Sequence, residues 1–345
     1  MENRLSNIRG AGIWGVGHAV PDRVLTNADL EEIVDTSDEW IVTRTGIKRR
    51  RIVAEDEATS DLAYEAALSA MERSGVDATD IDMVIVATVT PDMPFPATAC
   101  LLADRLGTQH AAAFDVEAGC TGFVYALVIA AQMVATRAYD RVLVVGSETL
   151  TRITNWEDRS SCVLFGDAAG AAIVGPCSPG TGILSQVLGS DGSGGDVLKM
   201  PAGGSRMVAS EETVRENLHT ISMKGSEVFK FAVRAMADSA SEAAARAGLR
   251  VEDIDCYIPH QANIRIIASS AKRLGIPMDK VFVNLEEYGN TSSASIPLAL
   301  AEAWEQGRIK PGDDVLLVGF GAGLTWGATA IRWLDESDRI LEGDR

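Results

Sequence analysis

An internal duplication constrains the fold more than any other feature of this sequence. The segment around Gly75 recurs around Gly248 (248 − 75 = 173), and the apolar run 142–146 recurs at 315–319 (315 − 142 = 173). Because self-similarity at a fixed offset is typical of repeated structural units, we expect the 345 residues to form two related halves, 1–179 and 180–345. The stretch 180–204, rich in glycine and serine, is the expected crossover or surface loop between them.

Both halves alternate short β-rich runs with alanine-rich helical stretches. Such alternation predicts an α/β fold with a largely parallel sheet in each half and helices on the sheet faces. The stretch 121–131 is apolar on every side, so as a helix it must be buried all round, between two sheets packed back to back. The expected strands are 83–89, 141–146, 169–174, 256–258, 315–319 and 329–333, and the expected helices are 62–74, 121–137, 230–247 and 293–306.

The charge balance narrows the classes of partner. The chain has 31 Lys and Arg against 49 Asp and Glu, a net charge of −18. That charge opposes non-specific binding to nucleic acid or to an anionic membrane. No apolar run approaches the ~18–20 residues of a membrane-spanning helix, and the N-terminus lacks the basic-then-apolar order of a signal peptide. We therefore expect a cytoplasmic protein with no nucleic-acid or membrane partner.

Cysteine and histidine usage argues against a metal site. The cysteines include no C-x-x-C pair, and no two histidines stand at i,i+4 spacing. This pattern predicts neither a disulfide framework nor a zinc site. The cysteines are Cys100, Cys120, Cys162, Cys177 and Cys256, and the histidines are His18, His110, His219 and His260.

Cys120 is the candidate nucleophile. It follows an expected strand at 111–116 and opens the buried helix, with Gly119 and Gly122 beside it. The positive end of a helix dipole and its free N–H groups lower the pKa of a thiol and so favour the thiolate. The alternative is a small buried core cysteine, which is our interpretation of the other four.

His260 and Asn290 are the candidate partners of this thiol. His260 follows an expected strand of the second half, at the strand end where open parallel sheets bind ligands. Cys120 and Ser293 are equivalent in the duplication (293 − 120 = 173), and Asn290 lies close to Ser293. The two strand-to-helix junctions should therefore meet beside a pseudo-twofold axis. A thiolate with imidazole and amide donors predicts acyl chemistry through a thioester; a structural role for the lone histidine is the alternative.

Two glycine-rich stretches resemble ligand-binding loops. The loop 319–327 follows a strand, but no Lys-Ser/Thr pair follows it, which excludes a P-loop. Its glycines suit a close approach of the backbone to a reacting carbonyl. Residues 10–15 match G-x-G-x-x-G, yet only nine residues precede them, too few for the strand that a dinucleotide site requires. We interpret them as part of a glycine-bearing first strand.

At these residues the sequence resembles the β-ketoacyl-acyl carrier protein synthase III family of the thiolase superfamily. The motifs that carry the resemblance occur in family order and are 119–123, 165–171, 259–263, 289–292 and 319–327. The resemblance implies a thiolase-like five-layered α-β-α-β-α sandwich and a homodimer. It also implies that an acyl-CoA primer is loaded on the cysteine and then undergoes decarboxylative condensation with malonyl-acyl carrier protein. No cofactor is expected, because acyl-CoA is a substrate.

The resemblance also implies roles for individual residues. Cys120 is the nucleophile, and His260 and Asn290 receive the malonyl thioester and stabilise its enolate. The backbone N–H groups of Cys120 and Ala322 form the oxyanion hole, although many relatives have glycine in place of Ala322 and Ala or Ser in place of Thr121. The expected substrate-binding residues are Trp40, Arg44, Arg159, Asn263, Arg265 and Phe320, and the expected walls of the acyl pocket are Phe95, Leu150, Leu164 and Phe165.

A basic patch should be needed for the carrier protein. An acidic enzyme and an acidic carrier repel each other, so docking requires local positive charge near the mouth of the site. The alternative is a set of solvated surface charges. The candidates around the His260 segment are Lys230, Arg265, Lys272 and Arg273, with Lys224 and Arg234 nearby.

Single residues distinguish this sequence from other enzymes that share the same fold. A biosynthetic thiolase resembles a pattern with a second cysteine in the C-terminal glycine loop, and 320–327 contains none. Elongating ketosynthases have a second histidine where this chain has Asn290. A ketosynthase or acyltransferase of secondary metabolism is an alternative that the sequence leaves open. A non-catalytic module that binds acyl-CoA or a carrier would have lost a catalytic residue, and none is lost. The sequence does not determine the length or branching of the primer.

Overall fold

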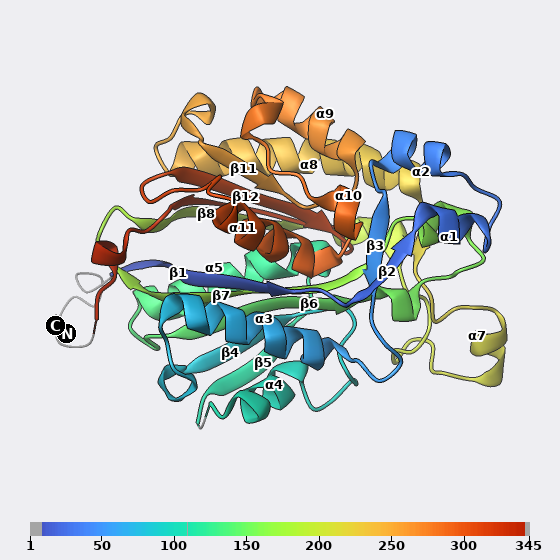
Figure 1. Ribbon diagram of the computed structural model, residues 1–345, viewed down its shortest axis with the longest axis horizontal. Coiled ribbons are helices and arrows are strands. Elements are labelled where there is room, and N and C mark those ends of the chain that lie inside the picture. The colour runs from blue at the N-terminus through green and yellow to red at the C-terminus, as the bar shows by residue number, and fades with distance from the viewer. Residues whose placement is uncertain (1–8, 109, 342–345) are drawn as a thin grey trace.

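The computed structural model describes residues 9–108 and 110–341, which form two main β-sheets with helices between and outside them (Figure 1). The strand order is β1-β7-β6-β4-β5 in the first sheet and β11-β12-β13-β8 in the second. The strands of the first sheet are β1 (Gly10–Ala19), β4 (Met83–Ala87), β5 (Ala112–Val116), β6 (Val142–Thr149) and β7 (Asp167–Cys177). Those of the second are β8 (Gly182–Ser190), β11 (Cys256–Pro259), β12 (Asp314–Gly321) and β13 (Thr325–Arg332).

The two sheets repeat one arrangement of strands. In the first sheet β4 runs parallel to β6 with Met83 opposite Val142, and in the second β11 runs parallel to β12 with Cys256 opposite Val315. The second pair lies 173 residues further along the chain at both partners (256 − 83 = 173 and 315 − 142 = 173). The duplication in the sequence is therefore a duplication of strand register.

The sheets are mixed, and the expectation of largely parallel sheets is wrong. β7 pairs antiparallel with β1 and β6, and β13 pairs antiparallel with β8 and β12. Residues 322–324 alone join β12 to β13. So short a link permits only an antiparallel pair, because a parallel pair needs a crossover of about a dozen residues.

Strand β8 is a second difference from the sequence-based expectation. It occupies residues 182–190, inside the stretch expected to be a loop, and forms one edge of the second sheet against β13. Its alternate side chains Ser185 and Val187 are buried. The surrounding glycines conceal this short alternation in the sequence.

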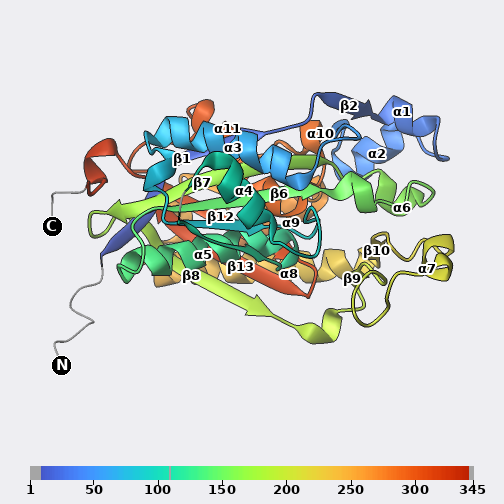
Figure 2. The same ribbon diagram turned by 90° about the horizontal axis from the view of Figure 1, so that it is seen from below.

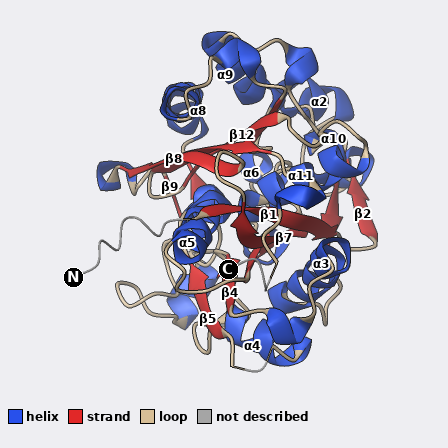
Figure 3. Cartoon of the chain, turned by 90° about the vertical axis from the view of Figure 1, so that its left-hand side faces the viewer, coloured by secondary structure: helices blue, strands red, loops and turns tan. Residues whose placement is uncertain are grey.

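Five layers result from the packing of helices on these sheets (Figure 3). Helices α5 (Gly122–Ala135) and α11 (Ser295–Glu305) lie between the sheets, where Phe123 and Leu300 are fully buried in a core that includes strand residues from both sheets. Helices α3 (Thr59–Ser74) and α4 (Thr98–Leu106) cover one outer face, and α8 (Gly225–Arg246) and α9 (Ile264–Leu274) cover the other. The predicted α-β-α-β-α sandwich and its central buried helix are confirmed.

The glycines at 10–15 lie inside β1, as the strand interpretation predicts. A Cβ added at Gly15 would lie 2.7 Å from the backbone nitrogen of Ser74, and one at Gly12 would lie 2.7 Å from Leu334 Cδ1. The missing side chains therefore allow α3 and the C-terminal segment to pack directly on the strand.

The smaller elements gather towards the right-hand end of the molecule in Figures 1 and 2. This end supplies the entrance of the site described below. Within residues 9–108 and 110–341, no helix has the length and apolar character needed to cross a membrane. The smaller elements are β2 (Arg23–Thr26), α1 (Asn27–Glu31), α2 (Asp38–Thr45), β3 (Arg49–Ile52), α6 (Arg159–Cys162), β9 (Leu198–Lys199), α7 (Glu211–Arg215), β10 (Ser222–Met223) and α10 (Leu285–Tyr288).

Candidate active site

One cavity of about 550 Å³ receives residues from both halves of the chain. Cys120 of the first half and His260 and Asn290 of the second all line it, together with Phe320 and Gly321. Much of the remaining lining is apolar and includes Val163, Leu198, Met223, Val228, Phe229 and Ile266. The cavity is therefore a largely apolar space that one thiol shares with a few polar groups.

Cys120 lies in a 3-10 turn, η3 (Gly119–Thr121), immediately before α5. Gly119 has a φ of 55°, in the left-handed region that favours glycine. A Cβ added at Gly321 would lie 2.4 Å from the backbone nitrogen of Cys120, and one at Gly119 would lie 2.7 Å from that of Ala322. The glycines therefore let η3 and the β12–β13 hairpin approach closely, with the backbone nitrogens of Cys120 and Ala322 at their contact.

The protonation of Cys120 differs from the sequence-based expectation. Burial raises the pKa of its thiol to about 12, a hydrogen bond from the Ser292 side chain lowers that pKa, and a charge on Glu148 raises it. The prediction of a lowered pKa is wrong for this geometry, because loss of hydration outweighs the helix N-terminus. The thiol is the resting form. Of the other cysteines, Cys100 is exposed, whereas Cys162, Cys177 and Cys256 are buried.

His260 follows β11 and is 1% exposed. Its Nδ1 lies 2.6 Å from Ser295 Oγ, while its Nε2 is buried with no hydrogen-bond partner among the described residues. Burial lowers the pKa of the imidazole to about 3, so the ring is neutral at physiological pH. The Phe320 ring stands edge-on against it, with 5.3 Å between ring centroids.

Asn290 is bonded to the first half by its backbone and to its own half by its side chain. Its N–H donates to Leu164 O at 2.8 Å, and its carbonyl accepts from Gly166 N–H at 3.1 Å. Its side-chain Oδ1 accepts from Ser292 N–H at 2.9 Å. Since the oxygen is engaged, the side-chain Nδ2 hydrogens are the donors that Asn290 can present to a ligand.

The cavity entrance has an aromatic and cationic wall. The guanidinium carbons of Arg44 and Arg159 lie 4.8 Å and 5.0 Å from the centroid of the Trp40 ring. Asn263 caps α9 by accepting from Arg265 N–H at 2.8 Å, and its Nδ2 donates to Arg44 O at 3.0 Å. Trp40, Arg44, Asn263 and Arg265 line the cavity, and Arg159 adjoins its lining residue Ser160.

The residues expected to form the acyl pocket separate into three groups. Leu164 and Phe165 line the cavity. Leu150 is 2% exposed and lies outside the cavity lining. Phe95 lies outside the cavity of its own chain, with 84% of its surface exposed.

The expected docking residues are all exposed near α8 and α9. Lys230 and Arg265 line the cavity mouth. Lys272 and Arg273 belong to the last turn of α9, and Arg273 forms an ion pair with Asp238 at 3.1 Å. The positive side chains therefore lie on two helices, with Lys230 on α8 and the other three on α9.

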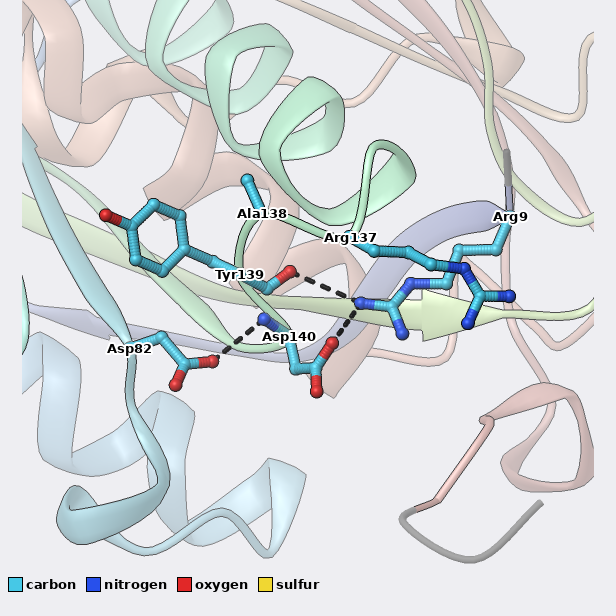
Figure 4. Close-up of a pocket in the computed structure, with 6 residues that line it drawn as sticks. All are labelled: Arg9, Asp82, Arg137, Ala138, Tyr139 and Asp140. Atoms are coloured by element: carbon cyan, nitrogen blue, oxygen red, sulfur yellow. Dashed lines mark hydrogen bonds and ion pairs between the residues drawn. The ribbon is translucent and has the colours of Figure 1, made fainter. Parts of the chain in front are cut away.

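A second, smaller cavity of about 170 Å³ lies where the end of α5 meets β4 and β6 (Figure 4). Arg9 forms an ion pair with Asp140 there and donates to Tyr139 O at 3.3 Å, while Asp82 accepts from Asp140 N–H at 2.8 Å. These bonds tie the segment before β1 to the loop before β6. The cavity contains none of the candidate catalytic residues.

Comparisons with known proteins agree with the geometry. Residues 114–192 match the family profile described as 3-oxoacyl-[acyl-carrier-protein] synthase III, and residues 244–333 match the profile of its C-terminal part. The β-ketoacyl-[acyl-carrier-protein] synthase III of Caldanaerobacter subterraneus subsp. tengcongensis is 59% identical over 323 residues, which cover 94% of this chain and 98% of that protein. The chain belongs to the β-ketoacyl-[acyl-carrier-protein] synthase III family.

Solved structures of related enzymes are also similar to this chain. The 3-oxoacyl-[acyl-carrier-protein] synthase III of Aquifex aeolicus VF5 has a TM-score of 0.88 at 45% identity, over 94% of this chain and 100% of that one. The priming β-ketosynthase from the R1128 polyketide biosynthetic pathway has a TM-score of 0.88 at 39% identity, over 95% and 98%. This synthase III is a condensing acyltransferase that initiates fatty acid synthesis. As a family, such enzymes use acyl-CoA and malonyl-acyl carrier protein and need no cofactor.

Three polar residues of the synthase III site have no role in the sequence-based assignment. Glu148, at the end of β6, is fully buried near Cys120. Ser292 interacts with the thiol, and Ser295 holds His260. An acidic residue at the end of an apolar strand was the one available signal for Glu148. Within the part of the chain that the structure describes, no group of three or more His, Cys, Asp or Glu side chains is arranged to hold a metal ion.

Proposed function

We propose that this synthase III loads an acyl-CoA primer onto Cys120 and condenses it with malonyl-acyl carrier protein at His260 and Asn290. The observation that supports the proposal most is the shared cavity, which brings a thiol from one half together with two hydrogen-bonding side chains from the other. The cavity is also largely apolar, which suits an acyl chain and excludes the water that would hydrolyse an acyl-enzyme.

In the loading step, the Cys120 sulfur attacks the carbonyl carbon of the acyl-CoA thioester. A new C–S bond forms to Cys120, the bond to the CoA sulfur breaks, and the proton of the Cys120 thiol ends on the departing CoA thiol. The backbone N–H groups of Cys120 and Ala322 would bind the oxyanion between these events. The Trp40 ring, with the guanidinium groups of Arg44 and Arg159 beside it, would bind the CoA adenine through stacking and cation–π contacts.

In the condensation step, His260 and Asn290 would act as neutral donors. Ser295 Oγ accepts from Gln261 N–H at 3.4 Å, so its own hydrogen is available for His260 Nδ1. Nε2 then carries the ring hydrogen and, together with the Asn290 amide in the same cavity, would be a donor for the thioester oxygen of a malonyl group. Negative charge develops on that oxygen when carbon dioxide leaves, so both donors act where the enolate forms.

The enolate carbon then attacks the acyl group on Cys120. A C–C bond forms, the C–S bond to Cys120 breaks, and the released thiolate takes up a proton, so that the β-ketoacyl product stays on the carrier protein. No electron acceptor or metal is needed to balance this sequence, in keeping with a cofactor-independent reaction.

We also propose a homodimer in the cytoplasm. Phe95 and Met93 are 84% and 41% exposed, and apolar side chains exposed together on one segment are typical of an interface. A second copy that buried this segment would give Phe95 the apolar surroundings that its own chain does not supply.

The proposal is tested by a survey of primers. The purified protein is incubated with straight and branched acyl-CoA thioesters, and intact-mass spectrometry records the acyl groups that it gains. We expect one acyl mass per chain for the primers that the cavity accommodates, and loss of that mass with release of carbon dioxide when malonyl-acyl carrier protein is added. An acyl group that malonyl-acyl carrier protein does not discharge would contradict the proposed condensation. The accepted primers would also separate fatty acid synthesis from a role like that of the priming ketosynthase.

A further inference from the structure

Glu148 is a fully buried carboxyl group beside the site, and the steps above do not use it. Its Oε2 accepts three hydrogen bonds, from Thr88 Oγ1 at 3.1 Å, Val89 N–H at 3.0 Å and Thr90 Oγ1 at 2.8 Å. Its Oε1 lies 2.8 Å from Ser293 Oγ and 3.3 Å from Ser293 N. One carboxyl group therefore joins the loop after β4 in the first half to the turn η8 (Ser292–Ala294) in the second.

The duplication shows why this carboxyl group stands in the first half alone. Glu148 is equivalent to Gly321 (321 − 148 = 173), and Ser293 is equivalent to Cys120. Gly321 must lack a side chain because a Cβ there would lie 2.4 Å from Cys120 N. At the equivalent place in the first half there is room, and the Glu148 side chain fills it by bonding Ser293.

The turn that Glu148 contacts is one that needs support. Ser292 has a φ of 48°, in the left-handed region, which residues with a side chain rarely adopt. Its N–H fixes Asn290 Oδ1, and its side chain interacts with both the Cys120 thiol and the Glu148 carboxyl group. Strained residues of this kind persist where the surroundings over-determine them, often at functional sites.

Counting hydrogens at Ser293 indicates the protonation state of Glu148. Ser293 Oγ lies 2.7 Å from Ala87 O and 2.8 Å from Glu148 Oε1, but a hydroxyl has one hydrogen. Ala87 O can only accept, so the Ser293 hydrogen belongs there. The short contact to Oε1 then requires a hydrogen on the carboxyl group. A neutral acid, with Oε1–H donating to Ser293 Oγ and Oε2 accepting from its three donors, satisfies each of these contacts.

We propose that Glu148 is a positioning residue that works as a neutral carboxylic acid: it holds the Asn290–Ser293 turn against Cys120 without placing a negative charge beside the thiol. The proposal rests on the roles given above to Cys120 and Asn290. Full burial raises the pKa of Glu148 against the lowering effect of the Thr90 hydrogen bond, and a charged Glu148 would raise the pKa of Cys120. Among the described residues, Cys120 in η3 is the titratable side chain that interacts with Glu148. The other side chains that contact Glu148, from the loop after β4 and from η8, carry hydroxyl groups.

Four variants of the full-length enzyme test the proposal: E148Q, E148A, S293A and, as a control for the proposed function itself, C120S. Gln keeps the shape, accepts at one end and donates at the other, whereas Ala removes the bond between the halves. We expect E148Q to keep self-acylation and malonyl decarboxylation within about two-fold, and E148A to lose roughly 10–100-fold in kcat of decarboxylation with a smaller change in KM, because misplacing a donor by about 1 Å has this effect. S293A, which removes the other side of the contact, should lose activity in the same direction.

A pH profile separates positioning from a merely structural role. The rate of Cys120 alkylation by iodoacetamide is measured from pH 6 to 10 in the wild type and in E148Q, with a C100S background to remove the exposed thiol. Because burial places the pKa of Cys120 above this range, the rate at each pH reports the fraction of thiolate, and equal rates in the two proteins support a neutral Glu148. A rate at least ten-fold higher in E148Q, which corresponds to a Cys120 pKa at least one unit lower, would show that the wild-type carboxylate is charged and would overturn the proposal.

Two further outcomes would also overturn it: E148A with wild-type kcat, or E148Q as impaired as E148A. If E148A does not fold, E148Q and S293A decide the same question, since the proposal requires the first to be active and the second to be impaired. Full activity of C120S would contradict the proposed function, whatever the Glu148 variants do.

Discussion

Gly119 and Ser292 adopt the same left-handed backbone conformation, with φ of 55° and 48°, at positions 173 residues apart (292 − 119 = 173). Each starts a 3-10 turn that leads into one of the two central helices. In the first half the next residue is Cys120, and in the second it is Ser293. The same turn thus presents a thiol in one half and, in the other, the serine whose turn supports Asn290.

Gly119→Ala should impair the loading step. The new Cβ would lie 2.7 Å from the Ala322 nitrogen, which is the proposed oxyanion donor, and a side chain at this φ is disfavoured by roughly 1–2 kcal/mol. Single-turnover acylation should fall by about 10–100-fold, the range for a displaced catalytic group. Ser292→Gly is the matched control, because glycine suits the same φ; we expect it to remain folded in a chemical denaturation assay. Wild-type acylation by Gly119→Ala would show that Ala322 N–H is not part of the oxyanion hole.

Malonyl decarboxylation should not follow the titration of an ordinary histidine. Burial lowers the pKa of His260 to about 3 from the ordinary value of 6.5, so the ring of the folded protein stays neutral through pH 6.5. Decarboxylation by a variant that cannot be acylated, Cys120→Ala, should show no inflection near pH 6.5. Appearance of such an inflection, and its loss in His260→Asn, would mean that a charged imidazole takes part.

The same lowered pKa predicts how His260 affects stability. An unfolded chain binds a proton at this residue below pH 6.5, whereas the folded chain does so only near pH 3, so stability from this residue is complete above pH 6.5 and is lost as the pH falls. The melting temperature of His260→Asn should therefore decline less than that of the wild type between pH 7 and pH 5. Equal declines in the two proteins would show that the folded protein also binds a proton at His260.

His260→Ala and Asn290→Ala should damage the second half-reaction more than the first. Their donors are placed where the enolate oxygen develops, whereas self-acylation relies on Cys120 and the backbone. Rates of self-acylation by acyl-CoA and of malonyl decarboxylation are measured separately for each variant. We expect decarboxylation to fall by roughly 100-fold or more, as for loss of one oxyanion donor, and self-acylation to change by much less. Equal losses in both steps would show that the assigned roles are wrong.

Charge reversal at Lys230, Arg265 and Lys272 should raise KM for malonyl-acyl carrier protein. These exposed side chains lie on α8 (Lys230) and α9 (Arg265 and Lys272), two of them at the cavity, and attraction between exposed charges is screened by salt. The effect should be largest at low ionic strength and should be smaller for a malonyl thioester without the protein. Charge reversal at Lys310, an exposed residue in the loop before β12, is the control. If carrier-bound and small thioesters lose equally, the three residues serve the site or the fold and do not dock the carrier.

The sequence predicted features of the fold that depend on repetition and periodicity. The 173-residue offset reproduces the strand register of both sheets, and the uniformly apolar segment is the helix between them. The predicted strand direction was wrong for β1, β7 and β13, because short apolar runs are alike in parallel and antiparallel sheets. β8 was missed because glycines flank its short alternation of buried side chains.

Properties of the site that depend on burial and on contacts between the two halves could not be predicted from the sequence. The pKa of Cys120 depends on burial that a helix N-terminus does not reveal, and Glu148 gains its role from Ser293, 145 residues away. Phe95 is a further example, since the family resemblance implies a pocket wall there while its own chain leaves the side chain exposed. Residue type therefore identified the candidate chemistry, and the packing of the two halves determines how it is arranged.

The most direct test of the account is to locate the acyl group after one turnover of the loading step. The protein is treated with an isotopically labelled acyl-CoA, digested, and analysed by peptide mass spectrometry, in parallel with Cys120→Ser and with Cys100→Ser as the exposed-cysteine control. We predict that the label lies on Cys120, that Cys120→Ser gains no thioester and loses condensation, and that Cys100→Ser behaves as the wild type. A label on another cysteine, together with full condensation by Cys120→Ala, would contradict the central claim that Cys120 is the nucleophile.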